Sequence, residues 1–158
     1  MKRAALLVLV ACQAHRSVIP PLGEVSAIDV EQKQGREPAR CGLVSYRVHV
    51  DLAAGTWSGG VCTVVWQAPD ALHAPLAAKQ GTLTPAQREA IAVGYRKLAV
   101  SPEQNSCGDD GGDLTLTLTR KDGSTATFLD ENWGCRKPPP VILDGLPAFA
   151  RSLMQLAL

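Results

Sequence analysis

Apolar and polar residues alternate most clearly over the stretch 44–51. Valine or tyrosine occupies every second position there and polar residues lie between them, a period of two that is typical of a half-buried strand. A strand is also predicted over 25–31. A partner for 44–51 is predicted over 57–66, after a turn at Ala53-Ala54-Gly55. His49 lies on the polar side of its strand, where a solvent-facing position is expected and a catalytic base is the alternative.

A second hairpin is predicted around the turn Lys121-Asp122-Gly123. Three leucines alternate with threonines before this turn, and apolar residues follow it. A two-residue loop would place Leu118 opposite Thr127 and mix the two faces of the hairpin. A three-residue loop with Gly123 in a left-handed conformation places Leu118 opposite Ala126 and makes one face wholly apolar. We therefore prefer the three-residue loop.

Two stretches predict amphipathic helices. Thr84-Pro85-Ala86-Gln87 matches a capping box with proline at the first helical position, and apolar residues follow it at helical spacing. The second helix is expected to begin after Asp144, whose carboxylate could cap it. Its apolar stripe consists of Leu146, Phe149, Ala150, Leu153 and Ala157. Both stripes are expected to face a core.

Together these elements predict an α+β fold with an antiparallel sheet of four to five strands, in two hairpins, packed against two helices. The stretch 70–80 is expected to be a surface connection, and Pro138-Pro139-Pro140 an extended spacer. The 158 residues, 46% hydrophobic and 20% charged, fit one ordinary domain. We expect this domain to span residues 24–158.

The start of the chain has the order of a secretory signal, with Lys2 and Arg3 ahead of an apolar run that is too short to span a bilayer. Leu9-Val10-Ala11-Cys12 resembles the bacterial lipobox. In lipoproteins with this motif the cysteine thiol is acylated, and cleavage makes the cysteine the first residue. The resemblance implies a signal peptide over 1–11, a lipidated flexible tether over 12–23 and a membrane anchor of acyl chains, such as palmitate, on Cys12. A plain secretory signal with an incidental Cys12 is the alternative.

Location and partners follow from the same region and from the charge. Gln13 follows Cys12, whereas lipoproteins that stay on the inner membrane often have aspartate there, so the resemblance implies the outer membrane if the source is Gram-negative. The net charge of +1 gives no basic surface for nucleic acid. The expected partners are the membrane, through Cys12, and an envelope protein.

Four further cysteines predict two disulfides, because an even number in an exported chain of this size is typical of a disulfide framework. They are Cys41, Cys62, Cys107 and Cys135. Three pairings are possible, and we favour Cys41 with Cys62 and Cys107 with Cys135 because each pair brackets one predicted hairpin. A four-thiolate zinc site is the alternative, but its ligands usually come in close pairs.

Carboxylates are predicted to gather at the open end of the second hairpin. They are Asp109, Asp110, Asp113, Asp130 and Glu131, and the preferred register places Asp113 opposite Glu131. Clustered oxygen ligands suit calcium, and the patch could instead bind a basic partner. The alternative is a solvated turn in which Asp and Gly serve backbone geometry.

The remaining candidates lie near the last cysteine. Trp133 is a candidate contact for a partner, and Cys135-Arg136-Lys137-Pro138 could present a basic residue as a protease-inhibitor loop. The sequence has no G-x-S-x-G, H-E-x-x-H or phosphate-binding glycine motif. It therefore favours a lipid-anchored cell-envelope domain with a non-catalytic binding or structural role. A protease inhibitor or a small envelope hydrolase is the alternative.

Overall fold

The computed structural model describes residues 19–33, 40–62, 77–104, 107–108, 112–133, 135–137 and 139–158. Its elements are, in chain order, a 3-10 turn η1 (Leu22–Glu24), β1 (Val25–Lys33), β2 (Arg40–Asp51), β3 (Thr56–Val61), β4 (Ala77–Thr82), α1 (Pro85–Tyr95), β5 (Ala99–Val100), β6 (Cys107–Gly108), β7 (Leu114–Arg120), β8 (Thr125–Leu129), β9 (Asn132–Trp133), β10 (Val141–Asp144) and α2 (Leu146–Ala157).

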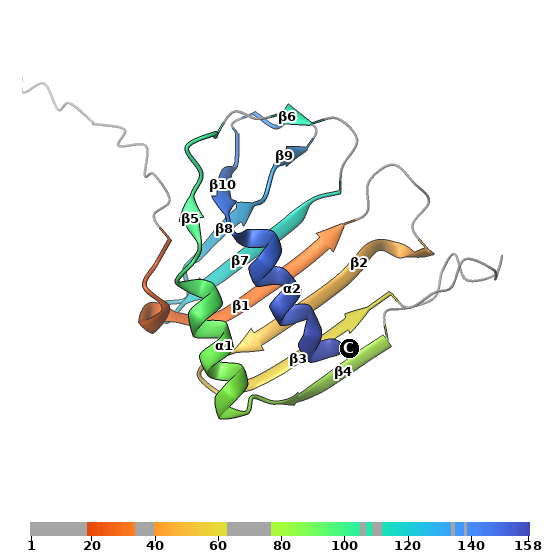
Figure 1. Ribbon diagram of the computed structural model, residues 1–158, viewed down its shortest axis with the longest axis vertical. Coiled ribbons are helices and arrows are strands. Elements are labelled where there is room, and N and C mark those ends of the chain that lie inside the picture. Colours follow the sequence, from red (N-terminus) through yellow and green to blue (C-terminus); the bar gives the residue numbers. More distant parts are fainter. Residues whose placement is uncertain are drawn as a thin grey trace, which may run out of the picture.

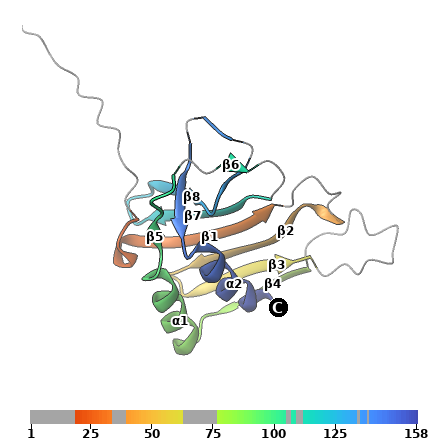
Figure 2. The same ribbon diagram turned by 45° about the horizontal axis from the view of Figure 1, so that its top comes forward.

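Eight strands form one mixed sheet in the order β4-β3-β2-β1-β7-β8-β10-β5, and β6 pairs with β9 beside it. Both helices lie on the same face of the large sheet (Figure 1), with α2 crossing the central strands and α1 packed next to α2. The view in Figure 2 shows the same arrangement from a second direction. The α+β class and the two helices are therefore confirmed.

Alternation along the central strands places the core between the sheet and the helices. Ile28 and Val30 of β1 are fully buried, as are Val48 and Val50 of β2. β1 pairs antiparallel with β2 so that Val30 lies opposite Val48, and the apolar sides of the two strands coincide. The residues between them face the other way, which follows from the two-residue period of a strand.

The predicted register of the second hairpin is confirmed. Leu118 lies opposite Ala126, and Leu116 opposite Phe128. Gly123 has φ +84°, and its N–H donates to the Arg120 carbonyl at 2.9 Å. Glycine adopts this left-handed conformation without the steric cost of a Cβ atom.

The first predicted helix and its capping box are also confirmed. The Gln87 N–H donates to Thr84 Oγ1 at 3.2 Å, and the Thr84 N–H donates to Gln87 Oε1 at 2.8 Å. The buried side chains at this helix are Ile91 and Tyr95, followed by Leu98 just beyond its end. These are the apolar positions that the helical period requires.

The second helix has the predicted apolar stripe but a different start. All five stripe residues are buried, whereas Asp144 is the last residue of β10 and does not cap the helix. The N-cap is Gly145, with φ +81° and no side-chain cap bond. A Cβ atom there would lie 3.0 Å from the Lys97 carbonyl oxygen. The close passage of two backbones therefore takes the position that a capping side chain would need.

The prediction of four to five antiparallel strands is wrong in number and in direction. β4 begins at Ala77, inside the stretch predicted to be a surface connection, and its alanine, glycine and polar residues give no alternation to detect. β10 follows the proline tract and pairs with β8 in parallel, with Val141 opposite Phe128. Strands as short as β5 and β10 are held by their neighbours, and they contain too few residues to show a period.

One complete disulfide is described where two were predicted. It joins Cys107 to Cys135 with a Cα–Cα distance of 5.1 Å, as in the favoured pairing. Cys62 is also disulfide-bonded, but its partner lies outside the described side chains. The predicted pairing of Cys41 with Cys62 is therefore not described.

Candidate binding face

The face of the sheet that the helices leave uncovered is lined by polar side chains. We define this open face by Asp29, Glu31, Arg47, His49, Ser58, Gln80, Thr115, Thr117 and Thr127. The strand registers align them in rows, since Asp29 lies opposite His49, His49 opposite Ser58, and Ser58 opposite Gln80. Side chains in one such row lie about 5 Å apart at Cβ, so four strands contribute to a continuous polar surface.

A carboxylate–imidazole pair lies at the centre of the open face. Asp29 Oδ1 is 2.8 Å from His49 Nδ1, and the two side chains are 42% and 44% exposed. A carboxylate at one ring nitrogen fixes the orientation of the imidazole and favours a proton on that nitrogen. Within the described part of the chain, Nε2 has no hydrogen-bond partner. His49 therefore presents an oriented acceptor to whatever occupies this face.

A second ionic group lies one row away. Arg47 donates through Nε to Glu31 Oε2 at 2.6 Å and also contacts that oxygen through Nη2, and Lys33 Nζ lies 3.7 Å from Glu31 Oε1. The Arg47 side chain is 60% exposed. Exposed pairs of this kind contribute about 0–1 kcal/mol to stability. The open face thus carries both signs of charge in fixed positions, at little gain in stability.

Three adjoining hollows follow the open face. The first has a volume of about 480 Å³ and the second about 540 Å³, and His49 and Ser58 line both of them. The third, of about 350 Å³, lies between Asp29 and Thr117 and shares Arg47 with the first. Together they form a broad surface suited to an extended ligand that crosses several strands, rather than one enclosed pocket.

The chemistry available on this face favours binding over covalent catalysis. Asp29, His49 and Ser58 occupy one row, but the described part of the chain contains no hydrogen bond between His49 and Ser58. A serine nucleophile needs such a bond to the base that removes its proton. The row therefore offers donors and acceptors without an activated nucleophile.

The predicted acidic patch is only partly described. Asp109 and Asp110 lie outside the described residues, and Glu131 is exposed. The Asp113 carboxylate contacts the Arg136 guanidinium and is 14% exposed, while burial raises the pKa of the Asp130 carboxyl above its ordinary value. Among the residues that the structure describes, no group of three His, Cys, Asp or Glu side chains is placed to hold a metal ion. The calcium hypothesis therefore gains no ligand set from them.

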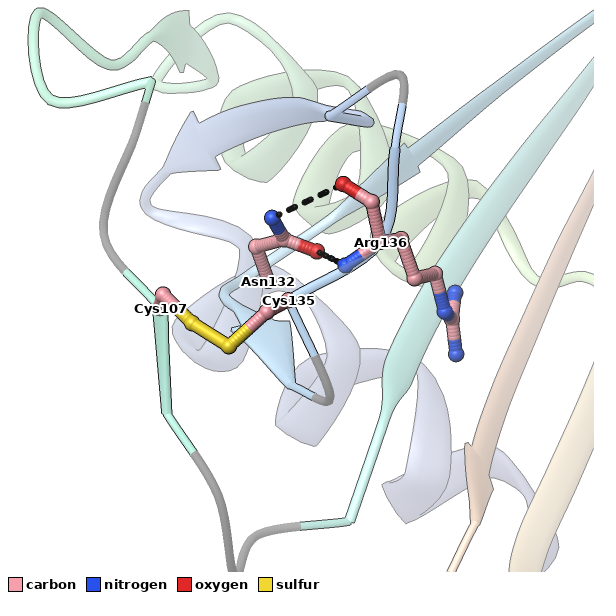
Figure 3. Close-up of a disulfide and its surroundings, with 4 residues drawn as sticks. All are labelled: Cys107, Asn132, Cys135 and Arg136. Atoms are coloured by element: carbon pink, nitrogen blue, oxygen red, sulfur yellow. Dashed lines mark hydrogen bonds between the residues drawn. A yellow bond between two sulfur atoms is a disulfide. The ribbon is translucent and has the colours of Figure 1, made fainter.

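The disulfide segment is held by an asparagine that the sequence analysis did not single out (Figure 3). Asn132 is buried, with 4% exposure. Its Oδ1 accepts from the Arg136 N–H at 3.0 Å, and its Nδ2 donates to the Arg136 carbonyl at 3.5 Å. Cys135, disulfide-bonded to Cys107, has φ +53°. The amide, the disulfide and the left-handed residue together fix the backbone of this segment.

This geometry bears on the inhibitor-loop interpretation. Both main-chain groups of Arg136 bond to Asn132, and its guanidinium contacts Asp113. An extended peptide that enters a protease cleft needs main-chain groups free to pair with the enzyme. Arg136 is instead committed to its own domain, and Lys137 is the exposed basic residue of the segment. Trp133 belongs to β9, and its side chain lies outside the described ones.

The comparisons add no relative. No family model matches the chain, and neither a curated protein nor a solved structure matches it. Among the described helices, none is long and apolar enough to cross a membrane. Cys12 and the rest of 1–18 lie outside the described residues, so the lipidated tether stays a prediction.

The sequence analysis identified His49 but missed Asp29 and Arg47. Each was visible only as a polar position in an alternating strand. Their pairing depends on the register between β1 and β2, which the chain does not set with a tight turn. A strand register derived from matching the apolar positions of both strands could have placed Asp29 beside His49.

Proposed function

We propose that the chain is a lipid-anchored cell-envelope domain with a non-catalytic role, and that its open face binds an extended polar partner in the envelope. One observation carries the proposal. The helices cover one face of the sheet, while the other presents paired charges around three adjoining hollows. Because these pairs add little to stability, recognition of a partner is the better reason for their fixed arrangement.

The chemistry of the open face suggests the kind of partner. Carboxylates at Asp29 and Glu31 lie beside the guanidinium of Arg47 and the imidazole of His49. A partner with both donors and acceptors, or with both signs of charge, complements such a surface, whereas a purely anionic polymer does not. We therefore favour an extended protein segment.

The anchor is tested by acyl labelling. Cells expressing the protein are fed a radioactive or clickable fatty acid with and without globomycin, and the membrane fraction is recovered. Cys12→Ser is expected to abolish both the label and the membrane association, because acyl chains supply the hydrophobic attachment. Labelling that persists in Cys12→Ser, or its absence in the wild type, rejects the anchor.

The binding face is tested by crosslinking in intact envelopes. A photoreactive amino acid is placed at Ser58 on the open face or at Gln155, which is exposed on α2. Defined adducts are expected only from Ser58, and Arg47→Glu is expected to remove them. The matched control is Arg151→Glu, the same charge reversal on the helical side. Equal adducts from both positions, or adducts that survive Arg47→Glu, contradict the proposal.

A small hydrolase is the second candidate, because the oriented Nε2 of His49 could act as a general base toward water. A panel of esters and amides distinguishes it from a binding domain. Turnover by the wild type that is lost in His49→Gln but kept in Thr82→Ala, a neighbouring substitution in the second hollow, supports the hydrolase. We expect no turnover.

A further inference from the structure

The segment that leads from the predicted tether is held against the domain at one point. The Tyr95 hydroxyl donates to the Pro20 carbonyl at 2.6 Å in a buried hydrogen bond. Ile19 and Leu22, on either side, pack against the core. The chain thus leaves the domain at a fixed position, beside the C-terminal end of α1.

Basic residues from two other segments surround this position. Lys121 donates its N–H to the Glu24 carbonyl at 2.9 Å, which places the β7–β8 turn next to η1. Arg120 lies close enough to Tyr95 for its charge to lower the pKa of that phenol, against a larger rise caused by burial. Lys97 follows the end of α1. In Figures 1 and 2 the red-orange start of the described chain, the end of α1 and the β7–β8 turn lie together.

We call this region the tether end and define it by Pro20, Glu24, Arg96, Lys97, Arg120, Lys121 and Asp122. Its acidic groups leave two lysines available. Glu89, one helical turn earlier, bonds Arg96 at 3.3 Å, and the Asp122 carboxylate accepts from the N–H and hydroxyl of Ser124. Lys97 and Lys121 are exposed, and within the described part of the chain neither has an ion-pair partner.

The length of the tether places these lysines near the membrane. Eight residues separate Cys12 from Pro20, and an extended chain covers at most about 3.5 Å per residue, or about 28 Å in all. Lipid chains on Cys12 would therefore hold the tether end within this distance of the headgroups. β1 carries the chain away from it over nine residues, so Lys33 lies about 27 Å farther along the sheet.

We propose that the tether end docks on the anionic lipid surface that holds the acyl chains, with Lys97 and Lys121 against the headgroup phosphates. This inference rests on the proposed lipid anchor of Cys12. Juxtamembrane lysines and an acyl anchor reinforce one another, because each alone binds a membrane weakly. Docking at this end directs the sheet away from the bilayer edgewise and leaves the open face accessible to its partner.

Lysine acylation on vesicles tests the orientation. The full lipoprotein is reconstituted into vesicles of phosphatidylethanolamine with one-third phosphatidylglycerol, into phosphatidylcholine vesicles and into neutral detergent micelles. A water-soluble acetylating reagent and mass spectrometry then give the rate at each lysine. We expect Lys97 and Lys121 to react at least threefold more slowly on the anionic vesicles than in either other sample. Lys33 and Lys137 should react alike in all three, and 1 M salt should restore the two protected rates.

Two results would overturn the inference. One is equal reactivity of Lys97 and Lys121 in all samples, and the other is equal protection on anionic and zwitterionic vesicles, which would mean proximity without recognition of charge. A variant pair supplies a second measurement. Lys97→Glu with Lys121→Glu should abolish the slowing of amide hydrogen exchange at residues 96–97 and 120–124 on anionic vesicles, whereas Lys33→Glu with Lys137→Glu should preserve it. Exchange that is unaffected by the first pair also overturns the inference.

Failure of the anchor itself gives a different outcome. If the chain carries no acyl group on Cys12, wild type and variants do not float with any vesicle, and the proposed anchor is rejected. If all of them float equally but Lys97 and Lys121 remain reactive, the anchor stands and the docked orientation is rejected.

Discussion

The two faces of the same strands are stabilised in different ways. On the covered face, Val30 and Val48 lie opposite each other with no exposed surface. On the open face, their sequence neighbours Glu31 and Arg47 form an exposed ion pair. Apolar burial contributes about 1.5–3 kcal/mol for each large side chain, whereas an exposed ion pair contributes about 0–1 kcal/mol.

This difference separates the residues that hold the fold from those that are free to serve a partner. Covered residues cannot change without loss of stability, because their neighbours are packed around them. Open-face residues can be replaced with little effect on folding. Variants on this face therefore report on binding with little interference from unfolding, and the predictions below test that separation.

The largest effect is expected for adjacent residues of β8. Phe128 is fully buried, whereas Thr127 is exposed and contacts only the Thr117 hydroxyl at 3.3 Å. Phe128→Ala should lower the free energy of unfolding by about 3–5 kcal/mol. Thr127→Ala should lower it by less than about 0.5 kcal/mol. Urea denaturation followed by circular dichroism measures both, and similar losses in the two variants would remove the distinction between the faces.

The next effect is alkaline and concerns the covered side. Burial raises the pKa of Tyr95 to about 12, against 10.0 in its model form. The unfolded chain therefore loses the phenol proton first as pH rises. The stability linked to this proton is fully present below pH 10 and is lost as pH rises toward 12. Near pH 11.5 the loss should reach about 2 kcal/mol, since each pKa unit corresponds to about 1.4 kcal/mol.

Tyr95→Phe isolates this contribution from other alkaline titrations. At pH 8 the variant should be about 1 kcal/mol less stable than the wild type, because it lacks the hydrogen bond to Pro20. Between pH 10 and 12 the difference should shrink and then reverse. Urea melts of both proteins at several pH values measure it, and a constant difference would show that Tyr95 does not carry the alkaline loss.

The covered face was also the more predictable of the two. Alternation gave β1, β2 and β7, and the requirement for one apolar face gave the register of the β7–β8 hairpin. The capping box at Thr84 and the α2 stripe were equally clear, because local chemistry alone specifies them. Physical rules that act within a few residues, or within one hairpin, can be followed from sequence.

The open face was not predictable in the same way. Asp29 meets His49 only through a pairing between strands whose register no tight turn sets. Likewise, Gly145 replaces the predicted Asp144 cap because the Lys97 carbonyl passes close by, and Asn132 holds Arg136 through a fold of the disulfide segment. Each of these depends on segments that come together in space, and a one-dimensional pattern does not record such contacts.

A smaller effect is expected where the two helices meet. A Cβ atom at Gly94 would lie 2.9 Å from Phe149 Cδ2, and the Phe149 ring is itself buried. Alanine improves helix propensity by about 1 kcal/mol, but overpacking costs about 1–3 kcal/mol. Gly94→Ala should therefore lower the free energy of unfolding by about 1 kcal/mol. Val93→Ala, at the neighbouring exposed position, should leave it unchanged or raise it slightly, and stabilisation by Gly94→Ala would show that the interface is loose.

The smallest effect is expected from the central pair of the open face. Asp29 and His49 are both more than two-fifths exposed, so their interaction should couple by less than about 1 kcal/mol in a double-mutant cycle of Asp29→Asn and His49→Gln. Each single variant should melt within a few degrees of the wild type. The same variants should nevertheless lose the envelope adducts formed from Ser58. Coupling above about 2 kcal/mol would instead make the pair an element of folding. The argument that its arrangement serves a partner would then fail, even if the adducts disappeared.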